Sequence, residues 1–388
     1  MGERKLKWIG AAAALCVSVA ANAGQGVTKT EIVVGSLQDL SGPAVGMGKP
    51  LNFGLQMRAD EINAAGGIHG RKIKLVVEDS GYNPQKGLLA AQKLVQQDKI
   101  FAMVGSLGTA VNMASFQPLF EKNVPNLLPL TAAREMYEPV SKLKFSFAAP
   151  YYDQMRTGVK WMAKERGAKK FCTIYQDDEF GLEVFRGAEH GLKDMGKEFA
   201  EKTTFKRGAT DFSAQVAKMK SADCDIVVLG TIIRETIGTV ATARKMGWDP
   251  IFLGSSAAYI DLIHKLGGKA MDGIYATFQT GVPYMDDPSK NVRDWGASYK
   301  AKFGDDPGLF AAYAYVAMDM FARAAEKAGP NLTTESLANA FETISFPHDM
   351  FGSPSFKFSK TDHLGNKRSR MGQIQNGRWV GLTDYLAD

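Results

Sequence analysis

The 388-residue sequence is poor in the residues and motifs on which enzyme and metal chemistry depend. It has only five histidines, and they show neither the spacing of metal ligands nor a His-Glu-x-x-His motif. A Gly-x-Ser-x-Gly motif, a phosphate-binding loop and a dinucleotide-binding fingerprint are also missing. We therefore predict no catalytic residue, no metal and no cofactor.

Strongly basic segments are missing as well. The net charge of the whole sequence is +6, and residues 1–23 account for +2 of it, which leaves +4. No run of lysine and arginine is long enough to indicate a nucleic-acid partner. There is no repeat of fixed period and no low-complexity tract, so the remaining chain is typical of ordinary globular domains, and its length suits two of them.

Residues 1–23 have the pattern of a targeting segment. Three basic residues precede an apolar run over 8–20, and Ala21-Asn22-Ala23 supplies the small residues of a cleavage site. The run is too short for a membrane anchor, and the residue before Cys16 is not the small residue of a lipoprotein signal. We predict a secretory signal peptide cleaved after Ala23 and an exported, periplasmic protein.

Cysteine is scarce, and only Cys172 and Cys224 remain after this cleavage. Both lie in or beside apolar, strand-like segments, "KKFCTIYQ" and "ADCDIVVLG". An oxidising compartment allows them to form a disulfide. Cysteine is also often simply a buried core residue, and we expect two buried free thiols.

What the sequence does contain is a regular alternation of strand-like and helix-like segments. Strands are predicted at 31–37, 71–79, 100–106, 124–130, 169–176, 198–205, 223–230 and 250–256. Helices are predicted at 49–67, 84–97, 287–303, 309–328 and 333–344, and a hairpin with an Asn376-Gly377 turn at 373–382. Leu51, Leu55, Ala59 and Ile62 share one face of the first helix. Successive βαβ units imply an α/β fold with two doubly wound parallel sheets.

In such sheets ligands bind outside the carboxyl ends of the strands. The candidate loops are therefore 38–47, 106–112, 129–133, 177–180, 230–235 and 254–259, and Gln38, Ser106 and Leu107 are candidate ligand contacts among them. The loop "VGSLGT" at 104–109 runs into a helix whose first amides are free to hold an anion. The acidic run 177–179 also opens a helix, and we interpret it as a helix cap rather than a catalytic pair.

Several segments resemble the branched-chain amino acid type of periplasmic substrate-binding protein, which supplies ABC importers. They are 32–87, with Ser-Gly-Pro at 41–43 and "INAAGGI" at 62–68, then "VGSLGT" (104–109), "VPNLLPLTAA" (124–133) and 177–193. The resemblance covers nearly all of the chain after residue 23. It implies two α/β lobes joined by a three-stranded hinge, a ligand trapped as the lobes close, and a membrane permease as partner. A monomer is expected.

The resemblance also implies where the chain passes between the lobes. Crossovers are expected near Ala149, near Phe278 and near Ser355. The first lobe would then contain residues 24–148 and 279–354, and the second residues 149–278 and 355–388.

Members of this family hold a ligand carboxylate with a hydroxyl at the position of Thr109 and with backbone groups of the segment Leu130-Thr131-Ala132. The carboxylate contact therefore comes from the resemblance. Thr109 also suits an N-cap.

Amino-acid binders of the family place a carboxylate in the second lobe to pair the ligand ammonium. Here that position is Ser256. The nearest acid is Glu235, which otherwise would be a surface helix residue. A buried ammonium without an anionic partner is costly. We therefore expect a small hydrophobic or aromatic organic acid as the ligand, with an amino acid or amide as the alternative.

Apolar residues stand at several further positions of the expected site. Tyrosine or another aromatic is frequent in the family near Met47, Phe180, Ile232 and Ile233. These residues, with Phe278, Tyr151 and Tyr313, would make the pocket more apolar. Arg234 would either reach across the cleft to a carboxylate or lie solvated in a loop.

Overall fold

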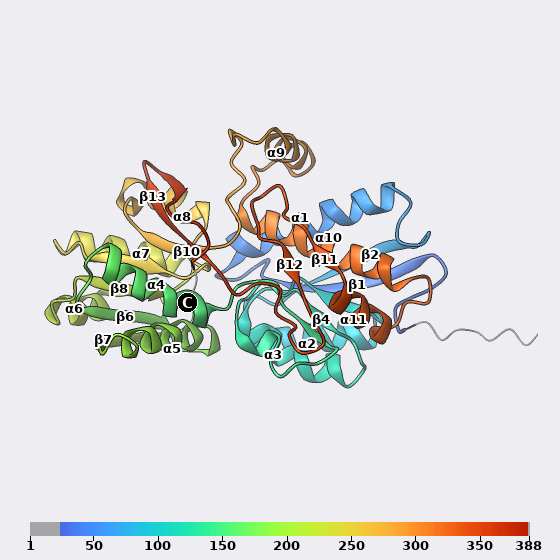
Figure 1. The fold of residues 1–388 in the computed structure, drawn as a ribbon, viewed down its shortest axis with the longest axis horizontal. Helices are drawn as coiled ribbons and strands as arrows, with labels where there is room; N and C mark the ends of the chain where they lie inside the picture. The colour runs from blue at the N-terminus through green and yellow to red at the C-terminus, as the bar shows by residue number, and fades with distance from the viewer. Residues whose placement is uncertain (1–23, 387–388) are drawn as a thin grey trace, which may run out of the picture.

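Two sheets, one parallel and one parallel except for an antiparallel hairpin at its edge, organise the chain into two lobes, which lie side by side in Figure 1. The computed structural model describes residues 24–386, so the predicted signal peptide lies outside the described residues. Within 24–386 no helix is long and apolar enough to cross a membrane. The same residues contain no group of three or more His, Cys, Asp or Glu side chains arranged to hold a metal ion.

The sheet of the first lobe has five parallel strands in the order β2-β1-β3-β4-β5. Their bounds are β1 Glu31–Gln38, β2 Lys72–Asp79, β3 Ala102–Val104, β4 Asn126–Leu127 and β5 Lys144–Phe145. All residues of β1 after the first are buried, as expected for a parallel strand covered on both faces. The predicted strands are confirmed, although β3 and β4 are shorter than the apolar runs that contain them.

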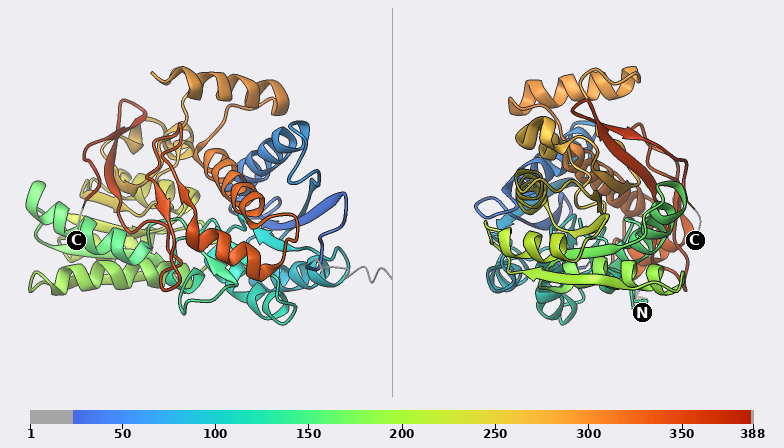
Figure 2. Two further views of the ribbon diagram at one scale, coloured as in Figure 1. Left: turned by 45° about the vertical axis from the view of Figure 1, so that its right-hand side comes forward. Right: turned by 90° about the vertical axis from the view of Figure 1, so that its left-hand side faces the viewer.

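Helices from both ends of the chain pack around this sheet or, in the case of α9, on the outer side of α1. They are α1 Val45–Ala64, α2 Pro84–Gln96, α3 Thr109–Phe120, α9 Lys290–Phe303, α10 Leu309–Ala328 and α11 Thr334–Thr343. The predicted apolar face of α1 is buried, and this helix packs against α10. Figure 2 shows α9 at the outer edge of the molecule, where Phe303 stacks on Phe53 of α1 with ring centroids 4.4 Å apart.

The second lobe contains a seven-stranded sheet in the order β14-β13-β10-β9-β8-β6-β7. Its strands are β6 Phe171–Gln176, β7 Phe199–Phe205, β8 Ile226–Gly230, β9 Ile251–Gly254, β10 Tyr275–Phe278, β13 Arg370–Gln375 and β14 Arg378–Gly381. The first five of these are parallel, and the hairpin β13–β14, predicted from its Asn376-Gly377 turn, adds antiparallel strands at one edge. Its helices are α4 Tyr151–Glu165, α5 Glu179–Lys193, α6 Ser213–Ser221, α7 Ile233–Lys245 and α8 Asp261–Gly267.

Cys172 and Cys224 form a disulfide, so the expectation of two free thiols is wrong. Cys172 lies on β6, and Cys224 lies just before β8, the strand that pairs with β6. Their Cα atoms are 5.9 Å apart although 52 positions separate them in sequence. That distance is typical of bridged cysteines. The pairing of β6 with β8 creates the contact, and the local sequence around either cysteine does not reveal it.

The chain passes between the lobes at three places, and Gln279 ties them together. Its buried side-chain oxygen accepts hydrogen bonds from the Ala149 amide at 2.8 Å and from the Asn366 side chain at 3.2 Å. Its side-chain amide donates to the carbonyl of Phe147 at 3.4 Å. Since these residues belong to different passes of the chain, one amide side chain links all three.

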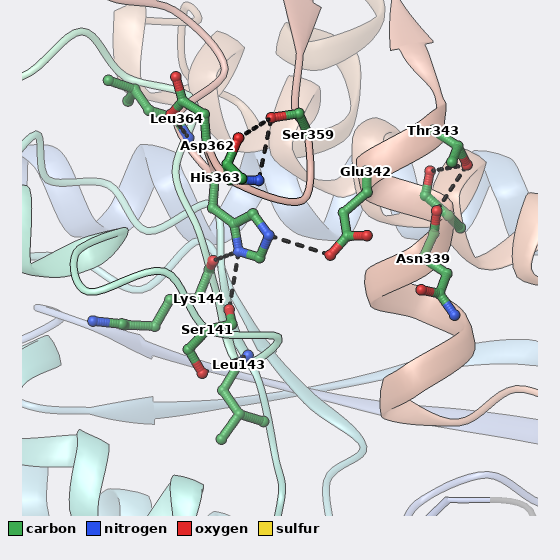
Figure 3. Close-up of polar contacts among 12 residues, drawn as sticks. Ser141, Leu143, Lys144, Asn339, Glu342, Thr343, Ser359, Asp362, His363 and Leu364 are labelled. Carbon is green, nitrogen blue, oxygen red and sulfur yellow. Dashed lines mark hydrogen bonds and ion pairs between the residues drawn. The ribbon is translucent and has the colours of Figure 1, made fainter.

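The segment before Asn366 keeps its contacts with the first lobe, as Figure 3 shows. The Nδ1 atom of buried His363 donates to the carbonyls of Ser141 and Lys144, at 3.0 and 2.9 Å. The His363 ring also stacks on Phe145 of β5, with ring centroids 3.8 Å apart. The predicted lobe boundaries remain a prediction, and these contacts lead us to propose the third crossover after His363 rather than near Ser355.

Candidate functional site

Loops at the carboxyl ends of strands from both lobes surround two adjoining cavities. The first is lined by Leu130, Thr131, Ala132, Phe147, Ala148, Tyr151, Ser256, Ala257, Phe310 and Tyr313. The second is lined by Met47, Tyr82, Leu107, Gly108, Thr109, Leu130, Thr131, Tyr151, Phe180, Ile232, Ala257 and Phe310. Five residues line both, so the cavities are two ends of one space between the lobes.

The two cavities are small in this arrangement of the lobes. Their volumes are about 30 and 20 Å³, which is room for one or two water molecules. An organic ligand therefore requires the lobes to part or the walls to move.

The amino end of α3 reaches one end of this space. Gly108 precedes the helix with φ of 91°, a left-handed conformation that favours glycine, and a Cβ atom there would lie 2.7 Å from the Tyr82 ring. Asn112 holds the loop by donating to the carbonyls of Ser106 and Gly108, at 3.0 and 2.7 Å. The first amides of a helix have no partner within it, so this end of the cavity presents hydrogen-bond donors and a partial positive charge.

Three hydroxyl groups gather beside this helix end. The Oγ1 atoms of Thr109 and Thr131 are 2.6 Å apart. Tyr151 also lines the cavity, and burial raises the pKa of its phenol to about 12, an effect that hydrogen bonds with Thr131 and the Ala132 backbone partly oppose. The Tyr151 phenol is therefore neutral near pH 7, like the two threonine hydroxyls. All three are hydroxyl groups that can donate hydrogen bonds to a carboxylate. Thr109 does not cap α3 with its side chain, so the N-cap interpretation of this residue is wrong.

Apolar side chains make up most of the remaining wall. Phe180 packs edge-to-face on Tyr151, with ring centroids 5.1 Å apart. Its place follows from the start of α5, where the Asp178 carboxylate accepts from the amides of Phe180 and Gly181. The helix-cap interpretation of the acidic run is therefore confirmed.

Ser256 lines the first cavity, at the position where the family resemblance placed a carboxylate. Its Oγ accepts a hydrogen bond from Gln154 Nε2 at 2.9 Å, and its amide donates to Gln154 Oε1 at 2.8 Å. No acidic side chain is among the residues that line either cavity. Both described cavities are therefore neutral on the second-lobe side.

Glu235 is buried, with 1% of its surface exposed, so the expectation of a surface helix residue is wrong. Its carboxylate pairs with Arg234 at 3.0 Å, but its second oxygen, Oε2, is buried without a hydrogen-bond partner. Burial raises the pKa of this carboxyl, and the nearby Arg234 only partly offsets the effect. Glu235 does not line either cavity. It lies in the first turn of α7, three residues after Ile232, which lines the second cavity.

Other predicted contacts lie away from the cavity walls. Gln38 and Ser106 are buried behind the loop, where Gln38 donates to the Gly105 carbonyl and Ser106 Oγ accepts from the Leu37 amide. Phe278 stacks on Tyr259, with ring centroids 4.3 Å apart. Ile233 and Arg234 are also not among the lining residues.

Tyr82, Phe310 and Ala257 line the space but were not predicted to do so. Tyr82 lies three residues after β2. The expectation that ligands bind at the carboxyl ends of strands would therefore have predicted this contact if it had been applied to this loop. Ala257 falls inside a candidate loop but has no chemical feature that marks it. Phe310 lies near the start of α10, and nothing in its local sequence indicates a cavity.

Two arginines bridge the lobes beside the cavity. Arg207 of the second lobe donates to the Tyr82 carbonyl at 3.1 Å, lies 5.0 Å from the centroid of the Tyr82 ring and also pairs with Asp178. Arg134 of the first lobe makes a two-pronged ion pair with buried Glu183 of α5, at 2.9 and 2.8 Å. The lobes are therefore joined by charged contacts on the side of the cavity that holds Tyr82 and Phe180.

Two doubly wound lobes that share a cavity at their strand ends define a type I periplasmic binding protein. Residues 31–378 match the model of the periplasmic binding protein family, and the chain belongs to this family. The leucine-, isoleucine-, valine-, threonine- and alanine-binding protein of Pseudomonas aeruginosa is 26% identical over 308 residues, 78% of this chain and 81% of that relative. The Leu/Ile/Val-binding protein homolog 2 of Brucella abortus is 25% identical, with 82% of this chain and 83% of the relative covered.

Solved structures show the same fold. A fatty acid ABC transporter substrate-binding protein from Thermomonospora curvata superposes with a TM-score of 0.84 at 24% identity, covering 94% of each chain. The branched-chain amino acid transporter substrate-binding protein LivJ from Streptococcus pneumoniae, in complex with isoleucine, gives a TM-score of 0.79 at 22% identity, covering 92% of this chain and all of LivJ. At these identities the likeness extends to the fold alone.

Proposed function

We propose that this chain is the periplasmic solute-binding component of an ABC importer. After export and cleavage behind Ala23, the protein captures a small hydrophobic or aromatic carboxylate between its lobes and delivers it to a membrane permease. It acts as a monomer and performs no chemistry on the ligand. The relatives named above support the transport role, because their names describe binding or transport proteins.

One observation carries the choice of ligand: the cavity presents hydroxyl donors at one end and no acidic side chain on its walls. Thr109, Thr131 and the amino end of α3 suit a carboxylate, since hydrogen bonds to a charged acceptor contribute about 1.5–3 kcal/mol each. An ammonium group entering the same space would lose its hydration without an anionic partner on the walls. An acid without an amine therefore fits best.

An amino acid is the second candidate, and the burial of Glu235 favours it. The unpartnered Oε2 atom of this carboxylate is available to a cationic group. For an ammonium to reach it, Glu235 must face the ligand when the lobes rearrange. The Pseudomonas aeruginosa relative, named as an amino-acid binder, adds support to this candidate.

A thermal-shift screen separates the two candidates. The protein, lacking residues 1–23, is unfolded and refolded to remove any carried-over ligand. It is then tested with leucine, phenylalanine, benzoate, phenylpropenoate and short fatty acids. A ligand present at 100 times its Kd stabilises a protein by about 2.7 kcal/mol, which raises the melting temperature measurably.

We expect the acids without an amine to raise the melting temperature and the amino acids to leave it unchanged. A response to leucine or phenylalanine alone would overturn the proposed ligand class and make Glu235 the first residue to mutate. Failure of every compound, with a correctly folded protein, would count against both candidates.

A further inference from the structure

The side chain of Gln154 makes a fully satisfied hydrogen-bond network behind the second-lobe wall. Gln154 lies in the first turn of α4 and is 2% exposed. Its Oε1 accepts from the Ser256 amide at 2.8 Å and from the Thr277 hydroxyl at 2.7 Å. Its Nε2 donates to the Ala149 carbonyl at 2.5 Å and to Ser256 Oγ at 2.9 Å.

Chemistry fixes the orientation of this amide. A backbone N–H can only donate and a backbone carbonyl can only accept, so Oε1 must face the Ser256 amide and Nε2 must face Ala149. The two donors and two acceptor sites of the Gln154 amide are then all in use. Rotating the amide would set Oε1 against the Ala149 carbonyl and Nε2 against the Ser256 amide, so both backbone contacts would be lost.

The orientation of the Gln154 amide determines whether the Ser256 hydroxyl can donate a hydrogen bond into the cavity. Nε2 can only donate, so Ser256 Oγ accepts from it, and the Ser256 hydroxyl proton remains available for another acceptor. Ser256 is only half-buried and lines the first cavity, whereas Thr109 lines the second. Tyr313 lines the same cavity as Ser256, but its hydroxyl is hydrogen-bonded to the Thr280 side chain. The first cavity therefore has a neutral donor, the Ser256 hydroxyl, which the Gln154 side chain holds in place.

We infer that Ser256 donates a hydrogen bond to a neutral oxygen of the ligand, separate from its carboxylate, and that Gln154 is the residue that positions Ser256. This inference rests on the proposed function and narrows it. The ligand class becomes hydrophobic or aromatic acids that carry a second, uncharged oxygen, such as a ring hydroxyl or a carbonyl. Gln154 itself does not touch the ligand.

Isothermal titration with benzoate and with 2-, 3- and 4-hydroxybenzoate tests the inference. We expect the wild-type protein to bind one hydroxylated acid about 3- to 10-fold more tightly than benzoate, the range expected for one neutral hydrogen bond. Ser256→Ala should bring the ratio of the two affinities, hydroxylated acid over benzoate, to about 1 without weakening the binding of benzoate itself. Gln154→Ala should lower the ratio as well, and the double variant should match Ser256→Ala, because Gln154 acts through Ser256.

Two further variants guard against a simple loss of structure. Gln154→Glu keeps both acceptor contacts, but the Ser256 hydroxyl then donates to the new carboxylate, so the ratio should again fall. Thr203→Val removes a buried hydrogen bond on β7, away from the residues that line the cavities, and should leave the ratio unchanged. A general loss of stability lowers both affinities together and leaves their ratio intact.

The outcomes separate this inference from the function on which it rests. If the acids bind but no hydroxylated acid is preferred, or if Ser256→Ala keeps the preference, the inference is wrong and the proposed function stands. Binding of amino acids alone would overturn both. A preference that disappears in Ser256→Ala and in Gln154→Glu, but not in Thr203→Val, supports the inference.

Discussion

The two lobes contribute different chemistry to the space between them. The first lobe supplies the amino end of α3 and the hydroxyls of Thr109 and Thr131. The second lobe supplies apolar side chains such as Phe180 and Ile232, together with Ser256, a neutral donor held by Gln154. Changes in the first lobe should therefore decide whether an acid binds at all, and changes in the second should decide which acid binds.

The lobes also differ in covalent support. Among the described residues the disulfide Cys172–Cys224 links strands of the second lobe, and the first lobe has no cysteine. The four predictions below test these contrasts, beginning with the largest expected effect.

Removal of the disulfide by the double change Cys172→Ser and Cys224→Ser should destabilise the second lobe. Closure of a loop of 52 residues corresponds to about 4 kcal/mol of lost chain entropy in the unfolded state. Urea unfolding with a probe in each lobe measures the effect. The transition of the second lobe should move to lower urea while that of the first lobe moves less. Dithiothreitol should destabilise the wild type but not the variant, and two free thiols in the denatured, unreduced wild type would contradict the prediction.

Thr109→Val should weaken binding of every carboxylate ligand, since it removes a hydroxyl from the end of the cavity where we propose that the carboxylate binds. The loss of one charge-assisted hydrogen bond corresponds to a roughly 10- to 100-fold higher Kd. Titration calorimetry with the ligand identified in the screen measures it, and Thr203→Val serves as the control for a lost buried hydroxyl. An unchanged Kd would show that the ligand carboxylate is bound by residues other than Thr109.

Glu235→Gln should stabilise the protein at neutral pH by about 1 kcal/mol, because it removes a buried charge with an unpartnered oxygen. The pKa of Glu235 is raised in the folded state. Its contribution to stability is therefore fully present below the pKa of the unfolded chain and is lost as pH rises through the folded pKa.

The stability gap between Glu235→Gln and the wild type should accordingly widen between acid and neutral pH in urea unfolding. The change Glu198→Gln, at an exposed position of the same lobe, provides the control. If the free energy of unfolding changes with pH in the same way for the wild type and Glu235→Gln, this account of the buried carboxyl is wrong.

Arg207→Ala should have the smallest effect, a roughly 3- to 5-fold faster release of ligand. Arg207 crosses from the second lobe to the Tyr82 carbonyl, so its loss removes one contact that holds the lobes together. Lys206→Ala is a matched control, because Lys206 lies next to Arg207 and pairs with exposed Asp177 on its own lobe. Stopped-flow fluorescence gives the release rates, and equal rates for the two variants would refute a role for Arg207 in holding the lobes together.

Local patterns in the sequence were enough to predict the framework. The alternation of strands and helices, the buried face of α1 and the Asp178 cap of α5 all depend on residues within one or two turns of each other. The expectation that ligands bind at the carboxyl ends of strands selected the loops that contain Thr109, Thr131 and Phe180, and the family resemblance singled out these residues. The same expectation also covers Tyr82, in a loop after 71–79 to which it was not applied.

Other features depend on which distant segments the fold brings together. Glu235 looks like a surface residue in its helix, yet packing around α7 buries it. Phe278 ends a strand of the second lobe but stacks on Tyr259, away from the cavities. Phe310 reaches the cavity because α10, from the last third of the chain, packs on α1.

By itself the sequence determined an α/β protein of alternating units, the likeness to a family and the position of the helix end that we propose for the ligand carboxylate. These depend on hydrophobic period, helix caps and short motifs, which are local properties. Only the tertiary structure decided the pairing of Cys172 with Cys224, the link that Gln279 makes between three passes of the chain, and the orientation of Ser256 by Gln154. Each of these contacts joins residues separated by more than 50 positions, and only strand register and lobe packing bring such residues within bonding distance.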